Sequence, residues 1–176
     1  MTGNSALLVD LYELTMAQVY FRHKRDTQST FDLFARQLPV HRSFLIAAGL
    51  DDILEYIKGF RFTPDSIRYL KSLGLFSPDF LEYLAGVRFT GDIWAMPEGT
   101  VIFPNEPIVR VTAPIMEAQM VEGFLLNTIN LQTMIASKAA RVVLAAQGRP
   151  VFDFSLRRTH GADASVKVAR SSYLAG

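Results

Sequence analysis

The chain has 176 residues, of which 49% are hydrophobic and 20% are charged, and its formal net charge at pH 7 is +1. This balance is typical of a folded globular protein, and it gives no reason to expect a nucleic-acid or anionic-membrane partner. The sequence has no cysteine, which excludes disulfides and thiolate metal sites and favours a reducing compartment. It shows neither a secretory signal near its start nor an apolar run approaching the ~18 residues of a membrane helix, so we expect a cytoplasmic setting.

The first predicted element is a helix that begins at Asp10. Glu13 follows Asp10 by three residues, which is the spacing of a capping box. Apolar residues recur at helical spacing along one side of this helix: Leu8, Tyr12, Met16, Val19 and Tyr20. This periodicity predicts a face that packs in the core. One interpretation of Tyr12 is therefore a core tyrosine whose hydroxyl lies near the surface.

Two strands and a helix are predicted next. The strands cover 31–36, which ends before Leu38-Pro39, and 44–48. Gly49 turns the second strand into a helix whose first turn carries Asp51 and Asp52, a favourable place for negative charge beside the helix dipole.

Proline and glycine mark two further short helices. Thr63-Pro64 and Ser77-Pro78 each place a capping residue before a proline at the first helical position. Gly74 and Gly86 stand where these helices should stop.

The pattern from Val87 onward changes to β and then back to α. Strands are predicted over 93–96, 100–103 and 108–112, followed by helix from Met116. The second part of this helical region carries small residues, which let a neighbouring helix or a ligand come close. Lys138 and Arg141 share a face there, and a solvated helix flank is the favoured interpretation of this pair.

The segment 151–161 holds the clearest candidate for a binding site. It starts with the apolar residues of a buried parallel strand and becomes polar at Arg157 and Arg158. Ligand chemistry in α/β sheets and barrels gathers at the carboxyl ends of strands, and guanidinium groups pair well with carboxylate or phosphate. A solvated basic turn is the alternative. An Asp163 or Ser165 cap then predicts a last helix through Tyr173.

Other familiar catalytic patterns are missing from the sequence. The glycines form neither a dinucleotide fingerprint nor a Walker loop, and no serine stands in a nucleophile elbow. His23, His41 and His160 are too scattered for a local metal motif, so we expect no metal site in this chain. His160 either acts beside an anion or only fixes its loop.

Five segments, in their order and spacing, resemble the nicotinate phosphoribosyltransferase family over essentially the whole chain. They are LVDLYELTMAQ from Leu8, FDLFARQLP from Phe31, AAGLDDILE from Ala47, ASKAAR from Ala136 and DFSLRRTHG from Asp153. The resemblance implies an α/β fold, in which an N-terminal α+β domain is followed by the start of an irregular type II phosphoribosyltransferase β/α barrel. The domain boundary would fall between residues 1–147, with a β-rich part at 87–112, and residues 148–176.

The resemblance also implies an activity and its site. The reaction joins nicotinate to phosphoribosyl pyrophosphate, giving nicotinate mononucleotide and pyrophosphate, with ATP and Mg²⁺ as co-substrate, in NAD biosynthesis. Phe154 would lie against the pyridine ring, together with Tyr12 reaching across from the partner in a homodimer. Arg157 would bind the anion beside the ring, and Arg36 would face the pyrophosphate. Arg158 and His160 would support this loop.

One part of the family pattern has no counterpart in this sequence. The histidine that ATP phosphorylates in the family lies beyond the barrel start, and none of the three histidines here matches it. We therefore expect residues 1–176 alone to be catalytically incomplete, with barrel-facing apolar surface exposed. The alternatives are a fragment that acts as a dimerisation or interaction module, and a sibling enzyme that uses nicotinamide or quinolinate.

Overall fold

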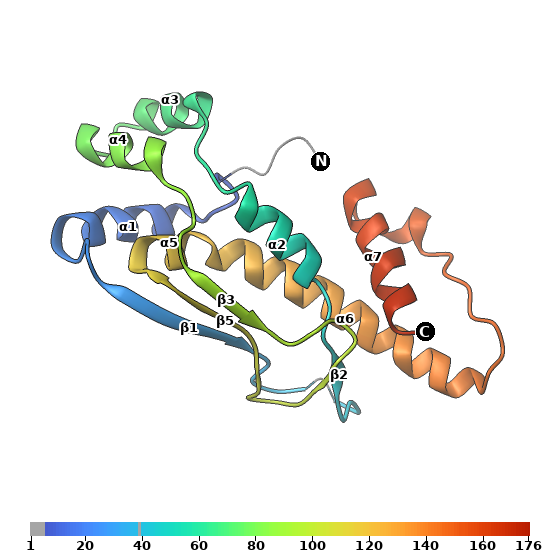
Figure 1. Ribbon diagram of the computed structural model, residues 1–176. Helices are drawn as coiled ribbons and strands as arrows, with labels where there is room; N and C mark the ends of the chain where they lie inside the picture. Colours follow the sequence, from blue (N-terminus) through green and yellow to red (C-terminus); the bar gives the residue numbers. More distant parts are fainter. Residues whose placement is uncertain (1–5, 39) are drawn as a thin grey trace. The chain divides into compact units, whose positions relative to one another are not determined.

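The computed structural model describes residues 6–38 and 40–176 and shows a mixed α/β fold (Figure 1). Its helices are α1 (Leu11–His23), α2 (Leu50–Lys58), α3 (Pro64–Ser72), α4 (Pro78–Gly86), α5 (Ile115–Met120), α6 (Glu122–Ala146) and α7 (Ala162–Leu174). A short 3₁₀ helix, η1 (Leu156–Arg158), precedes α7. The strands are β1 (Gln28–Phe34), β2 (Leu45–Ile46), β3 (Asp92–Ala95), β4 (Val101–Ile102) and β5 (Pro107–Pro114).

The starts of α1 and α3 confirm predictions made from capping residues. The capping box at Asp10 and Glu13 is present, and Glu13 Oε2 accepts the backbone N–H of Asp10 at 2.8 Å. Thr63 Oγ1 accepts the N–H of Ser66 at 3.1 Å, directly ahead of Pro64 at the first position of α3. These bonds satisfy backbone donors that the first turn of a helix leaves without a partner.

The predicted strands of the first two thirds of the chain are also confirmed. One sheet has the strand order β1–β5–β3, and β2 pairs with β4 in antiparallel register, Leu45 opposite Ile102. Along β5, Val109 and Val111 are buried while Arg110 between them is exposed. This alternation places one face of the central strand on a core. Pro39, the expected end of the first strand region, lies outside the described residues.

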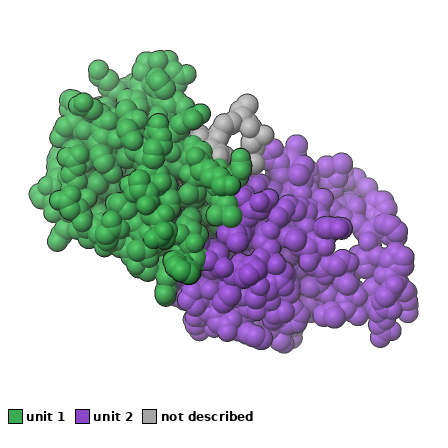
Figure 2. Space-filling view, viewed as in Figure 1, with its two compact units in different colours: residues 1–31, 53–94, 110–126 green, residues 32–52, 95–109, 127–176 purple. Residues whose placement is uncertain are grey.

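The chain divides into two compact units (Figure 2). Unit 1 comprises residues 1–31, 53–94 and 110–126, and unit 2 comprises residues 32–52, 95–109 and 127–176. This division does not follow the predicted boundary between residues 147 and 148, which stays a prediction.

The core of unit 1 is built mainly from aromatic and large aliphatic side chains. Tyr56, Phe60 and Phe80 are each at most 1% exposed. The Tyr56 ring stacks on that of Phe124 with a centroid distance of 3.8 Å. Aromatic pairs of this kind add about 1 kcal/mol to the stabilisation that burial itself provides.

Unit 2 is instead packed through small residues of α6. Ala136 and Ala140 form a buried cluster with Ile46 of β2. Beside them, Ser137 Oγ accepts the backbone N–H of Ile46 at 2.8 Å, and Thr133 Oγ1 accepts that of Ala48 at 3.2 Å. The small-residue spacing predicted the close approach of another helix or a ligand; the structure instead places β2 against these residues, and Leu174 of α7 also packs on the cluster.

Two predictions about apolar surface are wrong. The side of α1 expected to pack in the core is open, since Tyr12 is 53% and Val19 is 55% exposed, whereas Glu13, Leu14 and Ala17 are buried. Helical periodicity identifies residues that share a face, but not whether this chain covers it. Tyr12 is therefore not a core tyrosine.

The predicted strand at 151–154 is also absent. The segment has no regular structure, and Phe152 and Phe154 are 74% and 71% exposed. A parallel strand needs hydrogen-bonded neighbours on its edges, and no strand within residues 6–38 and 40–176 pairs with this segment. The last helix, α7, does form, but its N-cap is Gly161, at a φ of 103°, in place of Asp163 or Ser165.

Candidate functional site

The segment 151–161 forms a turn that is fixed mainly by its own hydrogen bonds. Asp153 Oδ1 accepts the backbone N–H of Ser155 at 2.8 Å. The carbonyl oxygen of Ser155 then accepts the N–H of Arg158 at 2.8 Å and both the N–H and the hydroxyl of Thr159, at 3.0 and 2.9 Å. Short polar side chains of this kind replace sheet or helix bonds in turns. The sequence therefore fixes the local shape of this turn although no strand forms.

This turn presents an aromatic ring and cationic groups to the outside. Phe154 is 71% exposed, and Arg157, Arg158 and His160 are exposed as well. Within the described part of the chain, the side chains of these residues form no ion pair or hydrogen bond. The structure thus groups four of the six predicted site residues on one segment. A flat ring and guanidinium groups on one exposed turn suit a planar anion, because the ring can stack while the cations pair with its charge.

The other two predicted residues come from elsewhere in the chain. Tyr12 lies in the first turn of α1, in unit 1, and nearby Glu13 and Glu122 raise the pKa of its hydroxyl. Arg36 is exposed in the bend after β1, in unit 2. The structure describes no contact between Arg36 and the 151–161 segment, so its assignment to the site stays a prediction.

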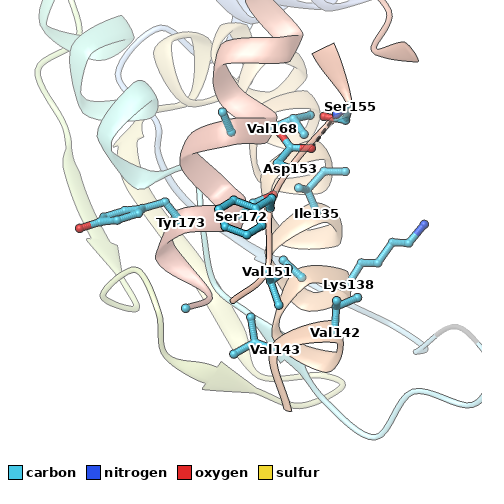
Figure 3. Close-up of a pocket in the computed structure, with 14 residues that line it drawn as sticks. Ile135, Lys138, Val142, Val143, Val151, Asp153, Ser155, Val168, Ser172 and Tyr173 are labelled. Atoms are coloured by element: carbon cyan, nitrogen blue, oxygen red, sulfur yellow. Dashed lines mark hydrogen bonds between the residues drawn. The ribbon is translucent and has the colours of Figure 1, made fainter. Parts of the chain in front are cut away.

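A cavity of about 560 Å³ lies in unit 2 between α6, the start of the 151–161 segment and α7 (Figure 3). Its lining is mostly apolar. It includes Val142 and Val143 of α6, Val168 of α7, and Phe152 of the 151–161 segment. Lys138, Asp153, Ser155 and Tyr173 supply its polar groups. The sequence indicated Lys138 only through the face that it shares with Arg141. The cavity was not predicted, because the start of the 151–161 segment was expected to be a strand.

Neither a metal centre nor a membrane span is found in the described part of the chain. No group of three or more histidine, cysteine, aspartate or glutamate side chains within residues 6–38 and 40–176 is placed to hold a metal ion. No helix in those residues is both long and apolar enough to cross a membrane.

Comparison with known proteins identifies the kind of protein to which this fold belongs. The model of the nicotinate phosphoribosyltransferase (NAPRTase) N-terminal domain matches residues 7–130. The crystal structure of human nicotinic acid phosphoribosyltransferase superimposes with a TM-score of 0.87 at 32% identity, over 95% of this chain and 34% of that one. A nicotinate-nucleotide pyrophosphorylase from Pyrococcus furiosus has the same fold, with a TM-score of 0.76 at 20% identity.

The fold is therefore that of the N-terminal part of nicotinate phosphoribosyltransferases, and the chain belongs to the nicotinate phosphoribosyltransferase family. A nicotinate phosphoribosyltransferase of Mycobacterium tuberculosis is 61% identical over 171 residues, which is 97% of this chain and 37% of that protein. The nicotinate phosphoribosyltransferase of Bacillus subtilis is 41% identical over 172 residues, 97% of this chain and 35% of that protein. The chain thus spans little more than a third of these curated relatives, and the family resemblance seen in the sequence is confirmed.

Proposed function

We propose that the polypeptide carrying these residues joins nicotinate to phosphoribosyl pyrophosphate, giving nicotinate mononucleotide and pyrophosphate. The names of relatives that are 61% and 41% identical support this reaction, as does that of the human structure. The observation that carries it is the turn at 151–161, which presents Phe154 and Arg157 together and leaves both exposed.

Each side chain of the proposed site has its own role in substrate binding. Phe154 stacks on the pyridine ring, worth on the order of 1 kcal/mol beyond burial. Arg157 pairs with the carboxylate of nicotinate or the ribose phosphate through two parallel hydrogen bonds. Arg158 and His160 support the turn, and Arg36 faces the pyrophosphate. Positioning both substrates and neutralising the leaving pyrophosphate supplies most of the acceleration, because the anomeric carbon becomes cationic as its bond to pyrophosphate breaks.

The proposal includes a homodimer in which Tyr12 completes the neighbouring subunit's site. The open apolar face at the start of α1 supports it, since Leu11 and Tyr12 of α1 and Leu8 just before the helix are each 53% exposed. Apolar side chains gathered on one helix face are typical of a surface that another protein covers.

The proposal also includes ATP, with Mg²⁺, as co-substrate, and a cytoplasmic reaction, where phosphoribosyl pyrophosphate and ATP are available. ATP would act through a phosphorylated histidine, and His23, His41 and His160 do not match that residue of the family. We therefore assign the ATP-dependent step to residues outside this segment and expect residues 1–176 alone to be inactive.

A product assay tests the proposed reaction. The complete polypeptide is incubated with phosphoribosyl pyrophosphate, Mg-ATP and nicotinate, nicotinamide or quinolinate in separate reactions, and the mononucleotide formed is quantified by chromatography. We expect nicotinate to be used at least 100-fold more efficiently than either other base. A preference for nicotinamide or quinolinate would instead assign the protein to a sibling activity, and no product with any base would favour a non-catalytic module.

A further inference from the structure

Glu98, in the turn between β3 and β4, connects the first residues of α2 with α7, and all of these residues belong to unit 2. Its Oε1 atom accepts the backbone N–H groups of Gly49 at 2.6 Å and Leu50 at 3.1 Å. Glu98 thereby supplies acceptors for the start of α2, where the chain has no capping side chain of the ordinary kind. The exposed fraction of its side chain is only 15%.

The same carboxylate binds Arg170 in the middle of α7. Arg170 Nη1 donates to Glu98 Oε1 at 2.9 Å, and Nη2 donates to Oε2 at 2.6 Å. Two parallel bonds between a guanidinium and a carboxylate fix the relative orientation of the two groups, which a single charge contact does not. This pair therefore links α7 directly to the α2 start and the β3–β4 turn.

The charges around this pair reinforce it. Arg170 lowers the pKa of the Glu98 carboxyl, and Glu98 raises the pKa of the Arg170 guanidinium. Arg170 also lies 3.6 Å from Asp51 Oδ2, and Lys167 Nζ lies 3.6 Å from Asp52 Oδ2. Two cations of α7 thus face three carboxylates that come from the α2 start and the β3–β4 turn.

The 151–161 turn is joined directly to this clamped helix. Gly161 is the N-cap of α7, and Arg170 follows it by nine residues, about 13 Å along a helix. The turn has its own internal bonds but no strand pairing within the described residues. Its placement against the rest of unit 2 therefore depends on the helices at its two ends, α6 and α7.

We propose that Glu98 and Arg170 form a clamp that holds α7, and through α7 the turn that carries Phe154 and Arg157, in the orientation needed for substrate binding. The substrate part of this inference rests on the proposed function. Glu98 and Arg170 are positioning residues in it, since they act through α7 and the turn.

Amide hydrogen exchange on the 176-residue chain tests whether the clamp holds α7. Arg170→Met removes the clamp and leaves the Glu98 cap on α2 in place. We expect peptides covering 151–174 to exchange at least tenfold faster, with peptides of unit 1 unchanged. Arg68→Met is the matched control, because Arg68 pairs with Asp65 at an exposed site in unit 1. Exchange of 151–174 within twofold of the wild-type rate would overturn the proposal.

Glu98→Gln breaks the clamp from its other side. The amide oxygen still accepts the N–H groups of Gly49 and Leu50, but the ionic pair with Arg170 is lost. We expect faster exchange over 151–174 again, by a smaller factor than in Arg170→Met. This variant keeps the test decisive if Arg170→Met does not fold.

Steady-state kinetics on the complete polypeptide test whether the clamp positions the site. We expect Arg170→Met to raise KM for nicotinate about tenfold while kcat falls less than threefold, and Arg170→Lys to recover part of the loss. A lower melting temperature with unchanged KM would show a structural role only and overturn the positioning claim. A wild-type polypeptide that makes no nicotinate mononucleotide would overturn the proposed function together with the substrate part of the inference, and the exchange comparison would still decide whether the clamp holds α7.

Discussion

Two glutamates, one in each unit, hold the starts of two helices, and their surroundings are opposite. Glu13 in unit 1 accepts the N–H of Asp10, yet its Oε1 atom is buried with no hydrogen-bond partner in the described residues. Burial raises the pKa of its carboxyl, and Glu122 adds to this effect. Glu98 in unit 2 has Arg170 as a partner, which lowers the pKa of its carboxyl. Both glutamates cap a helix start, but the buried charge of Glu13 opposes stability whereas the ion pair of Glu98 supports it.

This contrast gives the two carboxyls opposite effects on stability as pH changes. Folding raises the pKa of Glu13. The stability that its protonated side chain contributes is therefore fully present below the unfolded pKa of ~4.3, and it is lost as pH rises through the folded pKa. The pKa of Glu98 is lowered, so its contribution is complete above ~4.3 and is lost as pH falls through the folded value.

Glu98→Ala should give the largest effect on stability. It removes two acceptor bonds from the α2 start and leaves the Arg170 guanidinium without its main partner. We expect the free energy of unfolding at pH 7 to fall by about 2 kcal/mol, a value reduced for the partial exposure of Arg170. Urea denaturation followed by circular dichroism measures it, and a loss below about 0.5 kcal/mol would mean that the capping bonds contribute little.

Gly49→Ala should destabilise the same region of unit 2, the start of α2, through backbone strain. Gly49 has a φ of 108°, and a Cβ there would lie 3.1 Å from the carbonyl oxygen of Thr128. We expect a loss of about 1–2 kcal/mol in the free energy of unfolding, from urea denaturation. Gly86→Ala is the control, since a Cβ at Gly86 meets nothing within 4 Å. Equal effects of the two substitutions would show that the strain at Gly49 is not the cause.

Glu13→Gln should give the smallest effect, and in the opposite direction. The amide oxygen can still accept the N–H of Asp10, while the charge buried near Glu122 disappears. We expect the free energy of unfolding at pH 8 to rise by less than about 1 kcal/mol and the difference to vanish near pH 4, from denaturation at both pH values. A clear loss of stability at pH 8 would contradict the conclusion that the buried charge of Glu13 is destabilising.

The sequence predicts those parts of the molecule that depend on neighbours along the chain. The capping box at Asp10 and the Thr63-Pro64 helix start involve residues at most three apart, and both are confirmed. The prediction of a strand at 151–154 was wrong because a strand also needs hydrogen-bonded partner strands, which no local sequence pattern supplies. The open face of α1 was missed for a related reason, since periodicity does not show what covers a face.

The assignment of the candidate site stays a prediction. Four of its six residues come from the run between Asp153 and Gly161, so they are neighbours in the chain, and the structure shows them exposed on one turn. The pair of Glu98 and Arg170 had no signal in the sequence, because the two residues are 72 positions apart and meet only through folding. Electrostatic partners this far apart in the sequence can be recognised only once the tertiary structure is known.

The measurement that tests the central claim most directly is the nicotinate kcat/KM of Arg157→Ala in the complete polypeptide, compared with Arg149→Ala. Both arginines are exposed in unit 2, but only Arg157 stands on the turn beside Phe154. Loss of a charge-assisted pair with the substrate should lower kcat/KM by about 100-fold for Arg157→Ala, and Arg149→Ala should stay within about twofold of wild type. Near-normal kinetics for Arg157→Ala would contradict the assignment of the 151–161 turn as the nicotinate site.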